Sequence, residues 1–137
     1  ELGKTDSAEW GWDHAYKTGP DLPGVRASRV WRYAIAGKWS EAHTAFDDVD
    51  RLVTGNSRNV DIAVASLALG NRDAALSALE SAAKERSFYV TQAALGCDPT
   101  YALLKKESRF IAIVRQLGQV MCADDARPMV PARAGSR

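Results

Sequence analysis

Several features that would mark a particular class of protein are absent or scarce in this sequence of 137 residues. Its two cysteines, Cys97 and Cys122, are too few for a disulfide scaffold and lack metal-ligand spacing, so we interpret them as buried or incidental thiols. Eighteen Lys and Arg against seventeen Asp and Glu leave a formal net charge of +1. This charge is too small to create a positive electrostatic field that would attract nucleic acid. No apolar run approaches the roughly 20 residues that span a bilayer. These absences predict one domain that contacts neither nucleic acid nor a membrane.

Signatures of catalysis are also missing. The two histidines, His14 and His43, are 29 residues apart and have no Cys or further His nearby at ligand spacing. The sequence has no glycine-rich phosphate loop, no GxSxG elbow and no HExxH motif. Asp47 and Asp48 are neighbours on an expected helix and therefore point in different directions. We predict that the chain is not an enzyme and that it holds no metal or other cofactor.

What the sequence does contain is a spacing that recurs. Gly3, Gly37 and Gly70 fall in register, 34 and 33 residues apart. Each glycine is followed at fixed distances by a small, a large and a small residue, which would share one face of a helix. The three sets are Ala8, Trp12 and Ala15; Ala42, Phe46 and Val49; and Ala75, Leu79 and Ala82. The pattern predicts units of helix, glycine turn and helix, and the alternative is an antiparallel bundle in which Ala and Gly recur by chance.

The periodicity and the turn residues place the expected helices. They cover 6–17, 25–36, 40–53, 59–69 and 72–85, with a short helix from 88 to 95. Ser40 is the expected N-cap of the third of these, and Asp98 and Pro99 suit the start of a further helix. Beyond it, Phe110, Ile113, Val114 and Leu117 form an apolar stripe.

The repeated units resemble the tetratricopeptide repeat, a helix-turn-helix family of 34-residue units. Gly3, Ala8, Trp12, Ala15 and Pro20 match the second half of such a unit. The later units depart from the family, with Thr54 in place of proline and with Ser66 and Arg72 at two usual aromatic positions. The resemblance implies an all-α, right-handed solenoid of helical hairpins, and it implies that further polypeptide precedes the half repeat.

A second resemblance concerns the end of the repeats. Asp98, Pro99, Tyr101, Leu104, Arg109 and Phe110 resemble the segment that closes the helical repeat regions of bacterial winged-helix regulators, nucleotide cyclases and serine/threonine kinases. Glu107 and Ser108 stand where those proteins more often have Asp-Pro. The resemblance implies a C-terminal capping helix, which a solenoid needs in order to cover its last apolar face.

Together these patterns divide the chain into a repeat domain and a tail. The domain covers 1–120, with a half repeat at 2–20, repeats at 22–54 and 56–87, and capping helices at 88–120. Residues 121–137 are rich in Pro, Ala and Arg without periodicity, and we expect them to form a flexible tail.

In the tetratricopeptide family the first helix of each hairpin lines a concave groove. The corresponding residues here are Ala27, Trp31, Ala34, Ile35, Val60, Val64 and Leu67. Trp31 has two interpretations: an exposed anchor for a partner, or a core residue packed on the turn 18–24 or on an upstream helix. We expect Trp10, Trp12, Trp39 and Phe46 in the core.

The resemblance implies a protein interaction or regulatory module at the C-terminal end of a larger bacterial protein. The partner would be a protein or peptide bound in the groove, or an upstream domain of the same polypeptide. The alternatives are a structural or dimerising appendage, or a small-ligand sensor, of an upstream enzyme or transcription regulator. The state of the groove distinguishes these alternatives. The groove of an interaction module should be open, the groove of an appendage should be filled by the protein itself, and the groove of a sensor should be closed into a pocket. No export signal is visible, so we expect the cytoplasm, with the periplasm as the alternative if the upstream part carries a signal or anchor.

Overall fold

In the computed structural model the described chain runs from residue 2 to residue 123, and side chains are described from residue 10. The elements are α1 (Leu2–Thr18), α2 (Val25–Ile35), α3 (Trp39–Leu52), α4 (Arg58–Ala68), α5 (Arg72–Lys84), α6 (Phe88–Thr91), the 3₁₀ helix η1 (Pro99–Leu104) and α7 (Ser108–Gln116). Residues 2–123 contain no β-strand. The predicted all-α class is therefore confirmed for the described chain.

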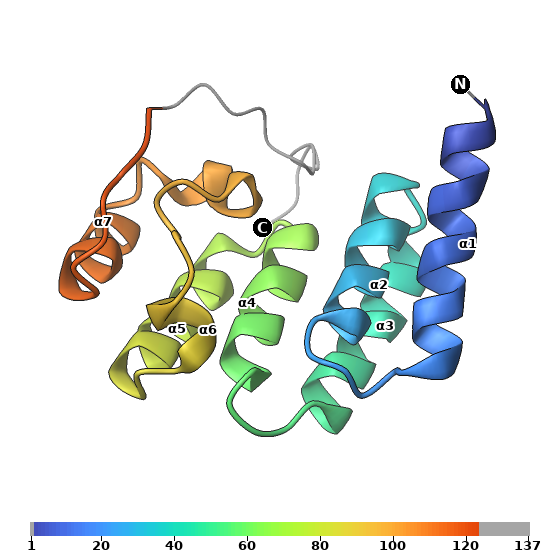
Figure 1. Ribbon diagram of the computed structural model, residues 1–137, viewed down its shortest axis with the longest axis horizontal. Coiled ribbons are helices and arrows are strands. Elements are labelled where there is room, and N and C mark those ends of the chain that lie inside the picture. The colour runs from blue at the N-terminus through green and yellow to red at the C-terminus, as the bar shows by residue number, and fades with distance from the viewer. Residues whose placement is uncertain (1, 124–137) are drawn as a thin grey trace.

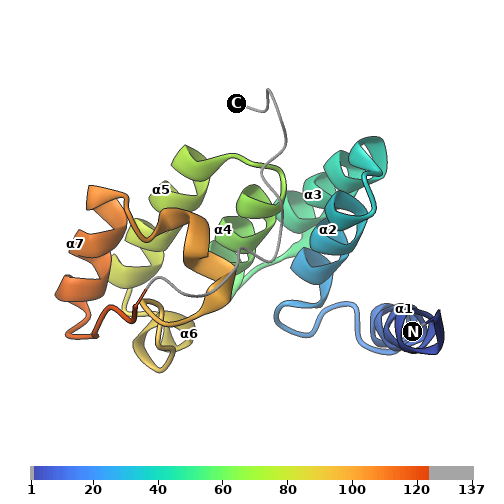
Figure 2. The same cartoon turned by 90° about the horizontal axis from the view of Figure 1, so that it is seen from above.

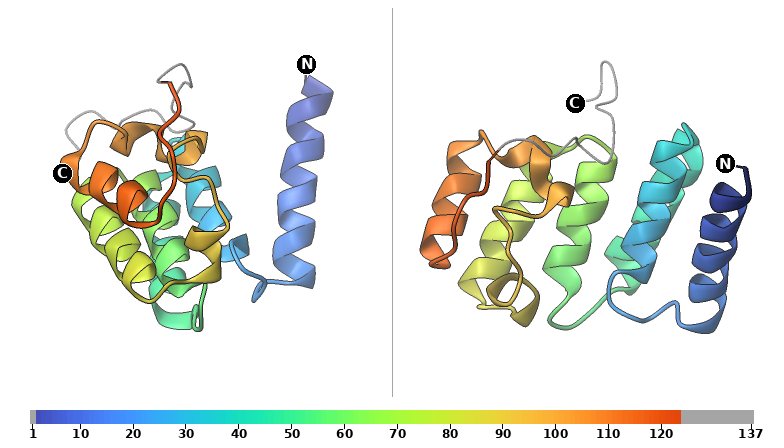
Figure 3. Two further views of the ribbon diagram at one scale, coloured as in Figure 1. Left: turned by 60° about the vertical axis from the view of Figure 1, so that its left-hand side comes forward. Right: turned by 45° about the horizontal axis from the view of Figure 1, so that its top comes forward.

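The helices follow one another in a row from α1 at one end to α7 at the other (Figure 1). Helices α2 and α3 form one hairpin, and α4 and α5 form the next, with α4 packed against both α2 and α5. Seen from above, α1 lies beside α2 at the end of the row, away from the other helices (Figure 2). The views in Figure 3 show the same order of layers.

The two hairpins turn in the same way. At the first turn the N–H of Gly37 donates to Ala34 O and the N–H of Lys38 to Tyr33 O, at 3.0 and 2.9 Å. At the second, Gly70 and Asn71 repeat both bonds one unit later, at 2.9 Å each. Gly37 and Gly70 have φ values of 72° and 78°, a left-handed conformation that costs glycine little. The prediction of helix, glycine turn and helix is confirmed for these two units, whereas Gly3 lies inside α1 rather than at a turn.

Helix α4 lies between two apolar clusters and is buried on most sides. One cluster joins α2 and α3 to one face of α4, and the other joins the opposite face to α5, α6, η1 and α7. Ala63, Ala65 and Ala68 are at most 1% exposed. Small side chains at these positions let the neighbouring helices approach closely, which is why α4 tolerates partners on both faces.

The C-terminal elements cover the end of the second hairpin. The Asp98 carboxylate accepts a hydrogen bond from the N–H of Thr100 at 2.8 Å, and Pro99 opens η1, as predicted. The side chains of Phe110, Ile113 and Val114 are buried against the second cluster, which confirms the apolar stripe of α7.

Arg109 holds the outer side of α7 against α5. Its guanidinium donates to Glu80 at 2.6 Å, to Asp73 at 2.5 Å and to the Ser77 hydroxyl at 3.0 Å. The hydrogen bond from Arg109 lowers the pKa of the Glu80 carboxyl below its usual value. Thus Arg109, one of the residues that resemble a repeat-closing segment, links the last helix to the preceding hairpin.

The interpretation of Cys97 and Cys122 as thiols is wrong. The two residues form a disulfide with their Cα atoms 4.8 Å apart. The disulfide belongs to a short segment, Gln119–Ala123, which we call the C-terminal strap. The Gln119 amide donates to Val90 O at 2.7 Å and accepts from Leu95 N–H at 3.0 Å, and the Cys122 N–H donates to Gly96 O at 3.1 Å. Residues 121–123 of the expected tail belong to this strap, while 124–137 lie outside the described residues.

Three local predictions also need correction. The N-cap of α3 is Lys38, so Ser40 lies in the first turn of that helix. The short helix expected from 88 to 95 is only one turn long and ends at Thr91. Trp10 and Trp12 are 68% and 43% exposed rather than in the core. Both lie on α1, which packs mainly against α2, so no second helix of the described chain covers them.

Candidate functional site

An apolar groove runs where α1, α2, α4 and η1 meet. It has a volume of about 190 Å³. We call it the apolar groove and define it by the residues that line it: Trp12, Ser28, Trp31, Ile35, Val64 and Thr100. Its lining is mostly apolar, with hydroxyl groups only at Ser28 and Thr100.

Trp31 forms the floor of the apolar groove. Its side chain is 8% exposed, and its indole Nε1–H donates to Val64 O on α4 at 2.9 Å. The hydrogen bond satisfies a buried donor and fixes α2 against α4. Trp31 is thus mainly a core residue, and one edge of it faces the groove.

The walls of the groove are more accessible than its floor. Ile35, the last residue of α2, is 49% exposed, and Trp12 on α1 is 43% exposed. Both are large apolar side chains that remain in contact with water. The surface is therefore open, and a ligand that covered it would remove apolar area from water.

The residues predicted for the groove fall into two groups. Trp31, Ile35 and Val64 line it. Ala27, Ala34 and Leu67 are at most 3% exposed and pack between helices, and Val60 is half-buried against the second apolar cluster. The first helices of both hairpins, α2 and α4, therefore do line the groove. Their residues that pack directly against a neighbouring helix are buried and cannot contact a ligand.

Sequence reasoning missed Trp12, Ser28 and Thr100. Trp12 occupies a repeat position that normally faces a neighbouring helix, so its register suggested the core. Thr100 reaches the groove only because η1 folds back over α4, and no local signal in the sequence indicates that return. The sequence signal nearest to Trp12 is the turn 18–24, which is dense in Gly and Pro and separates α1 from α2.

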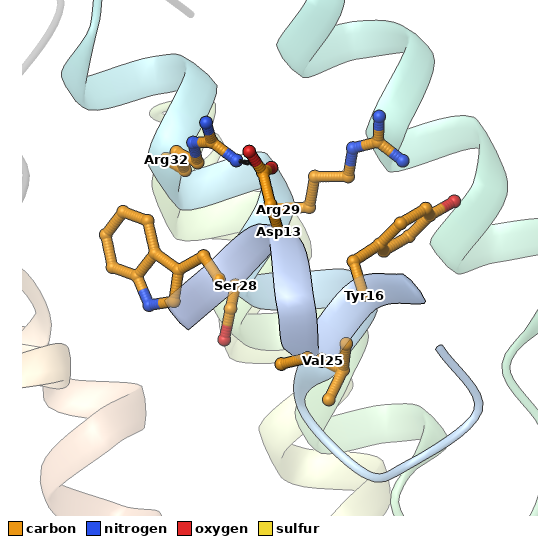
Figure 4. Close-up of a pocket in the computed structure, with 8 residues that line it drawn as sticks. Asp13, Tyr16, Val25, Ser28, Arg29 and Arg32 are labelled. Atoms are coloured by element: carbon orange, nitrogen blue, oxygen red, sulfur yellow. Dashed lines mark hydrogen bonds and ion pairs between the residues drawn. The ribbon is translucent and has the colours of Figure 1, made fainter. Parts of the chain in front are cut away.

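A smaller cavity of about 70 Å³ separates α1 from α2 and shares Trp12 and Ser28 with the apolar groove. Figure 4 shows its polar side, where Asp13 on α1 pairs with Arg32 on α2. The guanidinium of Arg29 lies 3.9 Å from the centre of the Tyr16 ring and donates to the Tyr33 hydroxyl at 3.1 Å. The hydrogen bond from Arg32 lowers the pKa of the Asp13 carboxyl. These contacts attach α1 to the first hairpin through polar groups rather than through a deep core.

A third cavity, of about 130 Å³, lies between the turn after α1 and the start of α4. Asp61 is 4% exposed there, and burial raises the pKa of its carboxyl despite the opposing effect of the polar groups of Ser57 and Gly24. Arg26 lines the same cavity and pairs with Asp21 at 3.0 Å, and its buried Nε has no hydrogen-bond partner. The arrangement ties the turn to α4.

Residues that bind metals do not gather in the part of the chain that the structure describes: no three His, Cys, Asp or Glu side chains lie close enough to share an ion. His14 instead stacks on Trp10, with ring centres 5.0 Å apart. Over the same residues, no helix has the length and apolar character needed to cross a bilayer.

Comparisons of the chain with models of protein families, with curated proteins and with solved structures give no match. The function must therefore be argued from the geometry of the molecule itself.

Proposed function

We propose that this chain is a non-catalytic, tetratricopeptide-like interaction module whose apolar groove binds an extended peptide or a helix of a partner protein. In this proposal it is the C-terminal, regulatory part of a larger bacterial protein. The partner is a separate protein or an upstream domain of the same polypeptide.

The observation that carries the proposal is the exposure of Trp12 and Ile35 beside the fixed floor formed by Trp31. Tryptophan offers large, rigid contact area and is enriched among residues that dominate binding energy. A groove whose floor is already fixed loses little conformational entropy when a ligand binds. An open apolar surface is also the feature that distinguishes an interaction site from a filled appendage.

The repeat architecture supports the same proposal. The shared geometry of the turns at Gly37 and Gly70 is what a solenoid of equivalent hairpins requires. The contacts of Arg109 and the burial of Phe110 suit a capping helix at its end. We therefore propose a right-handed solenoid in which α1 is the second half of an earlier repeat.

The small-ligand sensor is the second candidate, and the cavity around Asp61 and Arg26 is the observation that favours it. Its volume of about 130 Å³ is well below the 300–1,000 Å³ that is usual for small-molecule sites. The polar groups of Ser57 and Gly24 already act on the Asp61 carboxyl. We therefore prefer the apolar groove, which is open and lined by large apolar side chains, as the binding site.

The disulfide bears on the compartment. Disulfides persist in oxidising compartments and are rare in the cytosol. The Cys97–Cys122 bond therefore favours the periplasm, or another oxidising location, over the cytoplasm that the absence of an export signal suggested.

The proposal is tested by selecting peptides from a displayed library on the immobilised full chain and measuring their affinities. Ile35 and Leu52 provide a matched pair of variants, since each is the last residue of its helix and they are 49% and 43% exposed. Lysine at the end of a helix is favourable for the helix dipole, so both variants should fold.

We expect Ile35→Lys to weaken the selected peptides at least tenfold and Leu52→Lys to leave their affinities unchanged. Circular dichroism and thermal unfolding of both variants check the fold. Selected peptides that bind equally well to Ile35→Lys, or a library that yields no binder, would refute the proposal.

A further inference from the structure

The C-terminal strap and the apolar groove meet at the same element, η1. Thr100, near the start of η1, lines the groove. Lys105 directly follows η1, and its Nζ donates to Ala123 O at 3.5 Å. A 3₁₀ helix rises about 2 Å per residue, so the backbones of Thr100 and Lys105 are roughly 10 Å apart along its axis. The Lys105 side chain adds at most about 6 Å and its hydrogen bond 3.5 Å, so the Ala123 carbonyl lies within roughly 20 Å of Thr100 in the groove wall.

The strap also fixes the point from which the rest of the chain departs. The Cys97–Cys122 disulfide and the hydrogen bond from Cys122 N–H to Gly96 O act one residue before Ala123. Residues 124–137 are thus tethered by a covalent anchor beside η1. A segment tethered by a short stretch of chain experiences an effective concentration in the millimolar range at a nearby site.

The sequence that follows the anchor contains one apolar run, Pro128-Met129-Val130-Pro131. Proline fixes φ near −65°, and a residue that precedes proline favours extended backbone. The run therefore favours a polyproline II conformation, in which four residues span roughly 12 Å. Segments of this kind bind grooves lined by aromatic side chains, and the apolar groove contains two indoles, those of Trp12 and Trp31.

The tether is long enough for this run to reach the groove. Pro128 is five residues after Ala123. An extended chain spans at most about 3.6 Å per residue, so Met129, six residues after Ala123, reaches roughly 22 Å, which exceeds the upper limit of about 20 Å for the distance from Ala123 to Thr100. The groove volume of about 190 Å³ suits one or two inserted side chains, and methionine is flexible enough to fill an irregular space.

We infer that Pro128–Pro131 docks within the same molecule into the apolar groove, against Trp12, Ile35 and Val64, and competes there with the partner peptide. The inference rests on the proposed function, because it assigns a regulatory occupant to the same groove. The disulfide keeps the competing segment close to the groove. A partner displaces the segment when the partner binds the groove more favourably, at its own concentration, than the segment does at its effective concentration.

The two methionines allow a direct test in the full chain. Met121 lies in the strap and Met129 in the proposed docking segment, so methyl-¹³C methionine labelling gives one signal for each. We expect the Met129 methyl to show nuclear Overhauser contacts to the Trp12 ring and to the methyl groups of Ile35 and Val64. Its chemical shift should differ from that of a free peptide of residues 124–137 because the indole rings lie next to it.

Matched variants locate the contact. Ile35→Lys should move the Met129 signal to the position found in the free peptide, while Leu52→Lys should leave it in place and Met121 should move in neither. A Met129 signal that coincides with that of the free peptide in the unaltered chain overturns the inference. A Met129 shift that disappears on tenfold dilution also overturns it, because the segment would then occupy a second copy of the chain.

A further variant separates this inference from the proposed function. In the full chain, Met129→Asp should release the groove and tighten binding of the selected peptides about tenfold, as expected for a tether near millimolar concentration and a docked state of about 90%. Equal affinities for both chains, with loss only in Ile35→Lys, would overturn the docking and retain the proposed function. Met129 contacts in the groove, together with no peptide binding to Met129→Asp, would retain the docking and refute the proposed function.

Discussion

The indole of Trp31 donates a hydrogen bond to the backbone carbonyl of Val64, 33 residues later in the sequence and 2.9 Å away. This bond joins the first helices of the two hairpins, α2 and α4, at the floor of the apolar groove. A single residue thereby stabilises the packing of the hairpins and shapes the surface that we propose for binding.

Replacing Trp31 tests its role in stability. Trp31→Phe keeps an aromatic ring but removes the indole hydrogen bond to Val64 O and part of the buried ring, so we expect a loss of about 1–3 kcal/mol in the free energy of unfolding. Trp31→Ala also leaves a cavity and should cost about 3–5 kcal/mol. Trp10→Ala, at a site that is 68% exposed, should change stability by no more than about 0.5 kcal/mol. Urea denaturation measures all three, and equal losses at Trp10 and Trp31 would contradict the described burial.

The disulfide should contribute measurably to stability. It closes a loop with a sequence separation of 25 residues, for which chain entropy gives about 3.5 kcal/mol. We expect reductant to lower the unfolding temperature of the unaltered chain. The double variant Cys97→Ser and Cys122→Ser should have the same lowered unfolding temperature without reductant, and reductant should not change it further. Peptide mapping of unreduced protein should recover the two cysteines in one linked fragment, and free thiols at both positions would exclude the bond.

Gly96 should be required for the C-terminal strap to pack against the loop that contains Gly96. A Cβ atom at this position would collide with Val120 O and lie 3.0 Å from Met121 Cα, both of them backbone atoms. Gly96→Ala should therefore destabilise the chain and increase amide hydrogen exchange at Cys122. Gly11→Ala is the control, because no atom lies within 4 Å of its Cβ and alanine favours a helix interior by about 0.5–1 kcal/mol. If the two substitutions have effects of the same sign, the close contact at Gly96 is absent.

Arg86 occupies a position that favours glycine. It repeats the turn geometry of Gly37 and Gly70 after α5, and its φ is 53°. A residue with a Cβ loses about 1–2 kcal/mol in this conformation, so Arg86→Gly should stabilise the chain by roughly 1 kcal/mol. Lys84→Gly makes a similar change at the end of α5 and should destabilise it by up to about 1 kcal/mol. Thermal unfolding distinguishes the two, and a loss of stability in Arg86→Gly would contradict the left-handed assignment.

Asp61 should give stability a characteristic dependence on pH. Burial raises the pKa of its carboxyl in the folded state, so the folded chain binds this proton more tightly than the unfolded chain does. The stabilisation is present below the unfolded value of about 3.9 and is lost as pH rises through the folded pKa. Asp61→Asn removes the ionisation, so the difference in unfolding free energy between variant and unaltered chain should grow in favour of the variant as pH rises from about 4. A difference that is constant between pH 3 and pH 7 would show that Asp61 titrates normally.

The parts of the fold that could be predicted are those governed by local chemistry. The spacing of Gly37 and Gly70 located both hairpin turns, because a left-handed turn residue and a helical stripe of small and large residues are visible in sequence. Asp98 and Pro99 were recognised as a helix start for the same reason. The apolar stripe of α7 follows from its period alone.

The parts that could not be predicted depend on contacts between distant segments. Cys97 and Cys122 meet only because the strap returns along the loop after α6, and a sequence with two cysteines gives no reason to pair them. Trp12 occupies the position of the large residue in the repeated pattern, which predicts burial. It is exposed because its burial depends on which helices flank α1, and the sequence does not show this. Thr100 joins the apolar groove through the path of η1. Half of the lining of the candidate site was therefore predicted, namely Trp31, Ile35 and Val64, whereas Trp12, Ser28 and Thr100 required the structure.

The most direct test of the central claim is to locate a selected peptide on the full chain by intermolecular nuclear Overhauser contacts. The account predicts contacts from the bound peptide to the Trp12 ring and to the methyl groups of Ile35 and Val64, with the indole Nε1–H of Trp31 still protected from exchange by its bond to Val64. Contacts confined to another face, for example around Leu52 or the cavity at Asp61, would contradict the claim that the apolar groove is the binding site.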